Sequence, residues 1–103
     1  QRESFAFKPG AAVVSARRAG TTATLDQLNK YFTITQMPVV SSCYWNMVHG
    51  SRPEQVLQDE EGVCIMRTLG HNMAWILKCI EAGKAAGLDA PTQEPRVWTN
   101  FIR

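Results

Sequence analysis

The chain has 103 residues, of which 45% are hydrophobic and 19% charged, and its formal net charge is +2. This length suits one domain with a modest core, and the composition is that of an ordinary globular protein. Nucleic acid is not an expected partner, because the only basic run is the pair Arg17 and Arg18. No membrane association is expected, because no apolar segment reaches the roughly 20 residues that span a bilayer. The amino end also lacks the charged-then-apolar pattern of a signal peptide.

The cysteines indicate a reducing, cytoplasmic environment. Cys43, Cys64 and Cys79 are odd in number and none belongs to a C-x-x-C pair, so we expect no disulfide and no metal site. Cys64 and Cys79 fall within one helical pattern, where a free cysteine usually behaves as a small buried hydrophobe.

The first half of the chain predicts a strand, a helix and a second strand. After a connection over residues 1–10, the small apolar run 11–16 is typical of a strand covered on both faces. Thr24 with Gln27 three residues later fits a capping box that opens a helix. Residues 37–43 predict a second strand that begins near Pro38, and residues 44–50 a long loop. The predicted helix lays one face on the sheet through Leu25, Leu28, Tyr31 and Phe32.

The second half predicts a short helix and a long one. Pro53 suits the first turn of the short helix, and the acidic residues 59–61 suit the start of the long helix, where the helix dipole favours them. An apolar stripe marks the long helix over about residues 62–86, with Gly87 after its end. Trp75, Met66 and Met73 are interpreted as core or subunit interface. The tail 95–103 is irregular but carries Trp98, Phe101 and Ile102, so we expect it to pack on its own domain or on a sister subunit.

This order of elements predicts an α/β fold with a parallel sheet. In such sheets ligands bind at the carboxyl ends of the strands, and the N–H groups of the helix that follows favour an electron-rich partner. Two buried strands do not complete such a sheet, because each needs neighbours at its edges. We therefore expect residues 1–103 to be the second half of a larger domain, truncated or nicked, whose N-terminal half is missing or cleaved.

Several segments, in order, resemble the NADPH-dependent FMN reductases, and within them the flavodoxin-like branch of iron–sulfur flavoproteins and multimeric flavodoxin-type quinone reductases. The segments that carry the resemblance are residues 10–32 (GAAVVSARRAGTTATLDQLNKYF), 37–50 (MPVVSSCYWNMVHG), 59–62 (DEEG), 67–75 (RTLGHNMAW) and 99–103 (TNFIR). The resemblance implies a flavodoxin-like doubly wound parallel sheet, of which this chain supplies the last two strands and the last two main helices. The family's phosphate-binding loop and the cysteine cluster of its iron–sulfur members are absent from these residues.

The resemblance also implies a function. An intact member passes electrons from NADPH through FMN to a quinone, flavin or similar small-molecule acceptor, and the expected partners are the chain's own N-terminal half and further copies in a homo-oligomer. No residue has to be a catalytic acid, base or nucleophile, since the flavin carries the chemistry. Two other functions stay open: a non-enzymatic FMN electron carrier, and a cofactor-free half-domain that oligomerises.

Two groups of residues are the candidates for the site. The first lies beside the flavin ring by resemblance, and its alternative is an ordinary strand-to-helix turn with solvated arginines. The second follows the second predicted strand and lines a substrate pocket or a subunit interface, with His49 as a possible proton donor. The cofactor-binding group is Ser15, Ala16, Arg17, Arg18, Gly20 and Thr21; the substrate or interface group is Tyr44, Trp45, Asn46 and His49.

Overall fold

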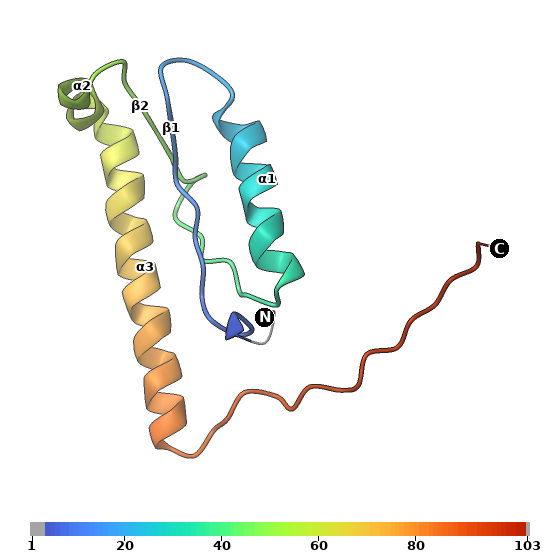
Figure 1. The fold of residues 1–103 in the computed structure, drawn as a ribbon. Coiled ribbons are helices and arrows are strands. Elements are labelled where there is room, and N and C mark those ends of the chain that lie inside the picture. Colours follow the sequence, from blue (N-terminus) through green and yellow to red (C-terminus); the bar gives the residue numbers. More distant parts are fainter. Residues whose placement is uncertain (1–3, 103) are drawn as a thin grey trace.

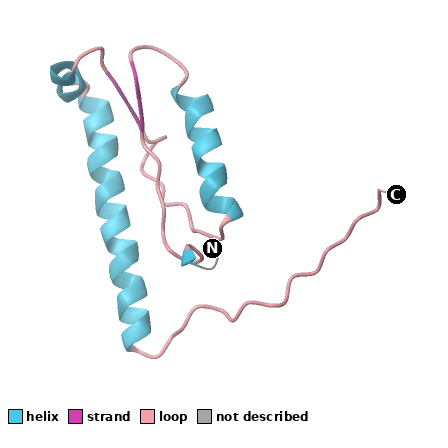
Figure 2. Cartoon of the chain, viewed as in Figure 1, coloured by secondary structure: helices cyan, strands magenta, loops and turns pink. Residues whose placement is uncertain are grey.

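The structure is a computed structural model that describes residues 4–102 and consists of a small parallel sheet between helices. The two strands pair in parallel, with Ala16 opposite His49 at their carboxyl ends. Figure 1 shows the strands lying between the two longer helices, and Figure 2 shows how little of the chain they occupy. The elements are β1 (Val14–Ala16), α1 (Thr21–Ile34), β2 (Met47–His49), α2 (Pro53–Gln58) and α3 (Glu60–Ala85).

The side chains of β2 show that α1 and α3 cover opposite faces of the sheet. The Thr21 hydroxyl at the start of α1 donates a hydrogen bond to Met47 Sδ at 3.2 Å. The next side chain, Val48, lies against α3, so closely that a Cβ added to Gly62 would be 2.7 Å from Val48 Cγ2. Successive side chains of a strand point to opposite faces. The expected α/β class, with a parallel sheet covered on both sides, is therefore observed.

The pairing with β1 continues beyond the regular ladder. Gly10 donates its N–H to the Pro38 carbonyl and accepts from the Val40 N–H, both at 2.9 Å, which forms an isolated parallel bridge between Gly10 and Val39. Residues 41–45 then leave the sheet, and Asn46, whose carbonyl accepts the Val14 N–H, returns to it before β2 begins. Residues 10–16 are thus one extended segment that faces two separate pieces of chain.

The prediction of a second strand over residues 37–43 is wrong in its position. Only Val39 of that range pairs, as a single bridge, and the strand lies at Met47–His49, inside the predicted loop. The segment that leaves the sheet between Val40 and β2 is bonded to α3 instead. The Ser42 hydroxyl donates to the Ile65 carbonyl at 2.7 Å, and Asn72 Nδ2 donates to the Ser41 carbonyl at 2.8 Å.

The start of α1 also differs from the prediction. The helix begins at Thr21 with Gly20 as its N-cap, at a φ of 93°, so Thr24 is not the cap. The Thr24 hydroxyl lies within the helix and donates to the Gly20 carbonyl at 2.8 Å. Glycine adopts this left-handed conformation without the steric strain of a Cβ, which explains why the turn from β1 can be so short.

The predicted short and long helices are confirmed. Pro53 occupies the first turn of α2, and α3 extends over 26 residues from the N-cap Asp59, with Glu60 and Glu61 in its first turn. Gly87 has a φ of 88°, and Leu88 donates its N–H to the Gly83 carbonyl at 2.8 Å, which closes the carboxyl end of α3. Within residues 4–102, no helix is long and apolar enough to cross a membrane.

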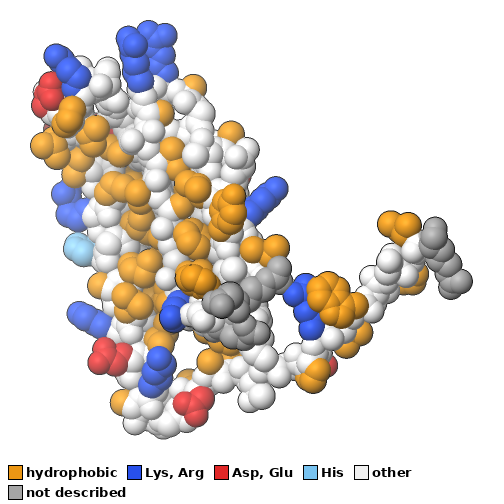
Figure 3. Space-filling view, viewed as in Figure 1, with side chains coloured by type: hydrophobic (Ala, Val, Ile, Leu, Met, Phe, Trp, Pro, Cys, Tyr) orange, Lys and Arg blue, Asp and Glu red, His pale blue; other side chains and the backbone are white. Residues whose placement is uncertain are grey.

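The core is small, and much apolar surface stays in contact with solvent. Figure 3 shows hydrophobic side chains gathered over both helices and between them on one face. Two interpretations of the sequence are wrong: Tyr31 is exposed rather than packed on the sheet, and Cys64 and Cys79 are exposed rather than buried. Trp75 is exposed and is not part of the core, so its place in a subunit interface stays a prediction. The buried hydrophobic side chains are those of Ala12, Leu25, Val40, Met47, Val48, Ile65 and Leu69.

Candidate functional site

The carboxyl ends of the two strands lie side by side and form the upper edge of the sheet. Ala16 is in register with His49, and the Gly50 N–H donates to the Ala16 carbonyl at 3.1 Å. The loop of residues 17–20 follows directly and leads into the first turn of α1. This is the edge at which open α/β sheets bind ligands.

The first predicted group of residues is brought together around this loop. Ser15 and Ala16 belong to β1, while Arg17, Arg18 and Gly20 are exposed in the loop. A Cβ on Gly20 would meet no atom within 4 Å, so the space beside its Cα atom is open. No side chain in the described part of the chain caps the N-terminus of α1. The loop therefore presents backbone N–H groups, the positive end of a helix dipole and two guanidinium groups to solvent.

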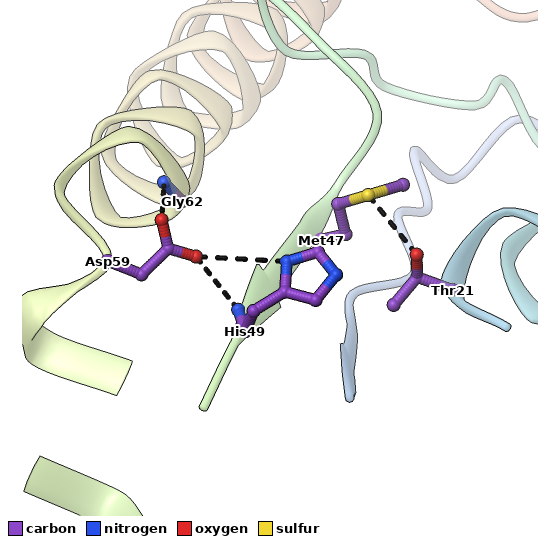
Figure 4. Close-up of polar contacts among 5 residues, drawn as sticks. All are labelled: Thr21, Met47, His49, Asp59 and Gly62. Atoms are coloured by element: carbon purple, nitrogen blue, oxygen red, sulfur yellow. Dashed lines mark hydrogen bonds and ion pairs between the residues drawn. The ribbon is translucent and has the colours of Figure 1, made fainter. Parts of the chain in front are cut away.

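Thr21 differs from the rest of its group because its side chain is buried. Its hydroxyl is already used in the hydrogen bond to Met47 Sδ, which joins α1 to β2 (Figure 4). Only the backbone of Thr21 is left to face a ligand, and its side chain instead fixes where the helix begins.

The outer edge of β2 is closed by a carboxylate. Asp59 Oδ2 accepts the His49 N–H at 2.8 Å, and Oδ1 accepts the Gly62 N–H at 3.0 Å (Figure 4). Further back along the same edge, the Met47 N–H donates to the Trp45 carbonyl at 2.7 Å. The N–H groups that β2 turns away from β1 are thus both satisfied, as expected for a protected edge strand.

These hydrogen bonds set the protonation of Asp59. The Gly62 N–H and then the His49 N–H hold the pKa of the Asp59 carboxyl below its usual value of 3.8. Burial raises this pKa by less than the two hydrogen bonds lower it, and the nearby His49 ring has the smallest effect, which lowers it. The His49 Nδ1 atom lies 3.9 Å from Asp59 Oδ2. Asp59 is therefore ionised at neutral pH and orients the end of β2.

The second predicted group is divided by the structure. Tyr44 and His49 line a cavity of about 250 Å³ at the outer edge of β2, together with Met47, Asp59, Glu61, Gly62 and Ile65. Trp45 is exposed and packs edge-to-face on Tyr44, with 4.8 Å between ring centroids. No residue of the loop on the β1 side belongs to this lining. The two predicted groups thus lie at the same edge but do not share one pocket.

Asn46 has a structural position in the ladder. It is buried, and its Nδ2 donates to the Ala12 carbonyl at 3.0 Å while its own carbonyl accepts the Val14 N–H at 3.0 Å. The Ala12 carbonyl thus receives from this side chain the hydrogen bond that a backbone N–H would supply in a continuous ladder. Its amide is therefore directed to the backbone rather than to the cavity.

The far edge of β1 is open. Backbone N–H and C=O groups alternate in direction along a strand. Those of Val14 and Ala16 face β2, and those of Gly10 bond to Pro38 and Val40. Among residues 4–102, the N–H and C=O groups of Val13 and Ser15 make no hydrogen bond, and both side chains are exposed. The outward N–H groups of β2 are thus bonded, whereas the outer edge of β1 offers unbonded groups to which a further strand could pair.

Comparison with known proteins adds no relative. No family model matches the chain, and neither the curated proteins nor the solved structures contain a significant match. The resemblance to the FMN reductases therefore stays a prediction. Within the described residues, no three His, Cys, Asp or Glu side chains are grouped so that they could hold a metal ion.

Sequence reasoning missed the roles of Asp59 and Asn46. The acidic run 59–61 presents Asp59 only as one of three acids at a helix start, although an Asp three residues before Gly62 is also the pattern of a capping side chain. Nothing in the local sequence around Asn46 indicates its bond to Ala12, because the two residues are 34 positions apart.

Proposed function

We propose that the chain is the C-terminal half of a flavodoxin-like domain that acts as an FMN-dependent NAD(P)H oxidoreductase. Electrons would pass from NADPH through FMN to a quinone, a flavin or a similar acceptor. The order β1, α1, β2, α3, with helices on both faces of parallel strands, supports this fold. The resemblance of residues 10–32 and 37–50 supports the activity.

The two unequal edges of the sheet support the placement of the missing strands. The outward N–H groups of β2 are bonded to Asp59 and to the Trp45 carbonyl, which suits a terminal strand, whereas Val13 and Ser15 on β1 are open. A parallel strand from the N-terminal half, added at β1, would make β1 an inner strand and cover its exposed side chains. Parallel strands are rarely stable without such neighbours.

The observation that carries the activity is the open loop of residues 17–20 beside that free edge. A flavin ring held there would receive hydrogen bonds from the loop N–H groups, and Gly20 leaves room for its approach. Arg17 and Arg18 suit an anionic group, since a guanidinium binds phosphate in a fixed geometry. The bound flavin would supply the hydride chemistry, and the residues present fit the carbonyl-rich side of such a ring.

The test is the visible absorption spectrum of the purified chain, followed by titration with FMN and an assay of NADPH oxidation with a quinone. We expect a flavin spectrum when the N-terminal half is present. The double variant R17A/R18A should weaken FMN binding about tenfold or more, the effect of losing a charge-assisted hydrogen bond. R67A removes an exposed arginine of α3 outside the loop and is the control.

Flavin binding with equal affinity in wild type, R17A/R18A and R67A would contradict the site. Binding without NADPH oxidation would favour an electron carrier of flavodoxin type over a reductase.

A cofactor-free half-domain is the second candidate, and the open edge of β1 is the observation that favours it. Two copies could pair at Val13 and Ser15 and so satisfy these backbone groups. A stable colourless oligomer that takes up no FMN, even with the N-terminal half supplied, would favour this function.

A further inference from the structure

The segment that follows α3 ends in a run of exposed apolar side chains. Residues 88–102 form no helix or strand, and Figure 1 shows them leading away from the helices. Trp98 is 78% exposed and Phe101 is 91% exposed, and Val97 and Ile102 are similarly open to solvent. We call residues 97–102 the arm. Contiguous exposed apolar groups of this size mark interaction surfaces in soluble proteins.

Local contacts keep the arm extended. Pro91 and Pro95 favour extended backbone and cannot continue the preceding helix. The Arg96 guanidinium lies over the Trp98 ring, 4.2 Å from its centroid, and the Ile102 N–H donates to Asn100 Oδ1 at 2.9 Å. An arm that is already extended loses less conformational entropy when it binds.

The same chain carries an apolar hollow of suitable size. A cavity of about 490 Å³ lies between the carboxyl-terminal part of α3 and the segment before β1. Phe7, Ile80 and Leu88 form much of its apolar wall, and Cys79 is part of the lining. Pro91 lies at its rim, beyond which the chain continues into the arm. We call this cavity the hollow.

We propose that the arm of one copy docks into the hollow of a second copy, and that the exchange is reciprocal. The chain passes its own hollow at Pro91, neither Trp98 nor Phe101 belongs to the lining, and Figure 1 shows the backbone after α3 leading away from the helices. A reciprocal exchange places two identical contacts about a twofold axis, which closes the assembly as a dimer. This proposal goes beyond the proposed function and needs no flavin.

The area involved is what a stable dimer requires. A buried Trp or Phe removes roughly 150–250 Å² from solvent. Trp98 and Phe101 of two arms, with the surfaces they cover, would bury on the order of 1,200–2,000 Å², the range of specific protein interfaces. Val97 and Ile102 add further apolar area.

The first experiment is sedimentation equilibrium of the full chain, alone and with the N-terminal half. We expect wild type to be a dimer and W98S/F101S to dissociate at least about 100-fold more readily, as expected when two aromatic anchors are lost from each arm. L57S replaces an exposed leucine of α2 and should leave the dimer unchanged. A monomeric wild type, or equal association of wild type and W98S/F101S, would overturn the proposal.

The second experiment identifies the hollow through its own thiol. In a C43S/C64S background, which keeps Cys79, the change Thr99→Cys should give a covalent dimer on oxidation with diamide. Thr22→Cys, exposed at the start of α1, should not. A disulfide within one chain would mean that the arm folds back onto its own body, and this or the absence of any disulfide would overturn the docking site. FMN titration of W98S/F101S separates this failure from failure of the proposed function.

Discussion

Two neighbouring side chains, Asp59 and Val48, leave no room for a side chain at Gly62. A Cβ at this position would overlap the Asp59 carboxylate and lie 2.7 Å from Val48 Cγ2. Gly62→Ala should therefore destabilise the fold by about 1–3 kcal/mol, although alanine is the better helix former. Urea denaturation followed by circular dichroism measures this change.

Gly70 is the matched control in the same helix. A Cβ there would meet nothing within 4 Å, and the residue is exposed. Gly70→Ala should stabilise α3 by roughly 0.5–1 kcal/mol. Changes of the same sign in both variants would contradict the packing described for Gly62.

Asn46 carries one backbone hydrogen bond across the gap in the ladder. Asn46→Ala would leave the buried Ala12 carbonyl without its partner, and should reduce the free energy of unfolding by about 1–3 kcal/mol. Asn72→Ala removes an exposed hydrogen bond to the Ser41 carbonyl and should have a smaller effect in the same denaturation series. An equal loss in the two variants would argue against the role assigned to Asn46.

The pKa of Asp59 links its hydrogen bonds to acid stability. Because this pKa is lower in the folded chain than its ordinary value of 3.8, the ionised carboxylate stabilises the fold above that value. The stabilisation is lost as pH falls through the lower, folded pKa. Wild type should therefore lose stability below about pH 4 more steeply than Asp59→Asn, which has no such titration. Parallel curves of unfolding free energy against pH for the two proteins would contradict this.

At the scale of elements, β1 should tolerate proline only at positions whose N–H faces away from β2. The Val14 N–H donates to the Asn46 carbonyl at 3.0 Å, whereas the Ser15 N–H faces the open edge. Val14→Pro should destabilise the isolated chain by about 3 kcal/mol or more, and Ser15→Pro by much less. Similar losses in denaturation of both variants would show that the outer edge of β1 is already paired.

The sequence predicted the kinds of element better than the position of the second strand. The apolar stripe over residues 62–86 is long and periodic enough to identify a helix. The continuous apolar run over residues 11–16 indicates a strand, of which the structure forms only Val14–Ala16. Val39 with Val40, and Met47 with Val48, are two short apolar pairs that compete for one strand position. Contacts of the intervening residues with α3 decide between them, and such contacts are not encoded locally.

The candidate site was predicted as far as local sequence allows. The run from Ser15 to Thr21 spans the end of β1, the loop of residues 17–20 and the first residue of α1, so these residues are neighbours because they are continuous in the chain. Tyr44 and His49 do share a cavity, but with Asp59 rather than with that loop. Which of these groups meet depends on the path of residues 41–45 outside the sheet, a tertiary feature.

At the scale of the whole molecule, the chain is less compact than its length implies. Its radius of gyration is 17.5 Å, against about 13 Å for a typical globular chain of 100 residues. The arm accounts for part of this extension, since Figure 1 shows it projecting from the body. Such a molecule buries little apolar surface by itself, and its stability should depend on association.

Association therefore predicts a thermal midpoint that depends on protein concentration. Binding that occurs only in the folded state raises stability by mass action. The midpoint of wild type should rise by a few degrees for each tenfold increase in concentration, and that of W98S/F101S should stay constant. Scanning calorimetry over two decades of concentration measures both; a constant midpoint in wild type would contradict the expected dependence on association.

The carboxylate of Asp59 has one more consequence, for the way the molecule opens. It holds an amide of the last strand residue and an amide in the first turn of α3 with its two oxygens. Neither amide can be released by movement of Asp59 without releasing the other. The His49 and Gly62 amides should then exchange with deuterium at matched rates, as one cooperative unit that joins a strand edge to a helix start.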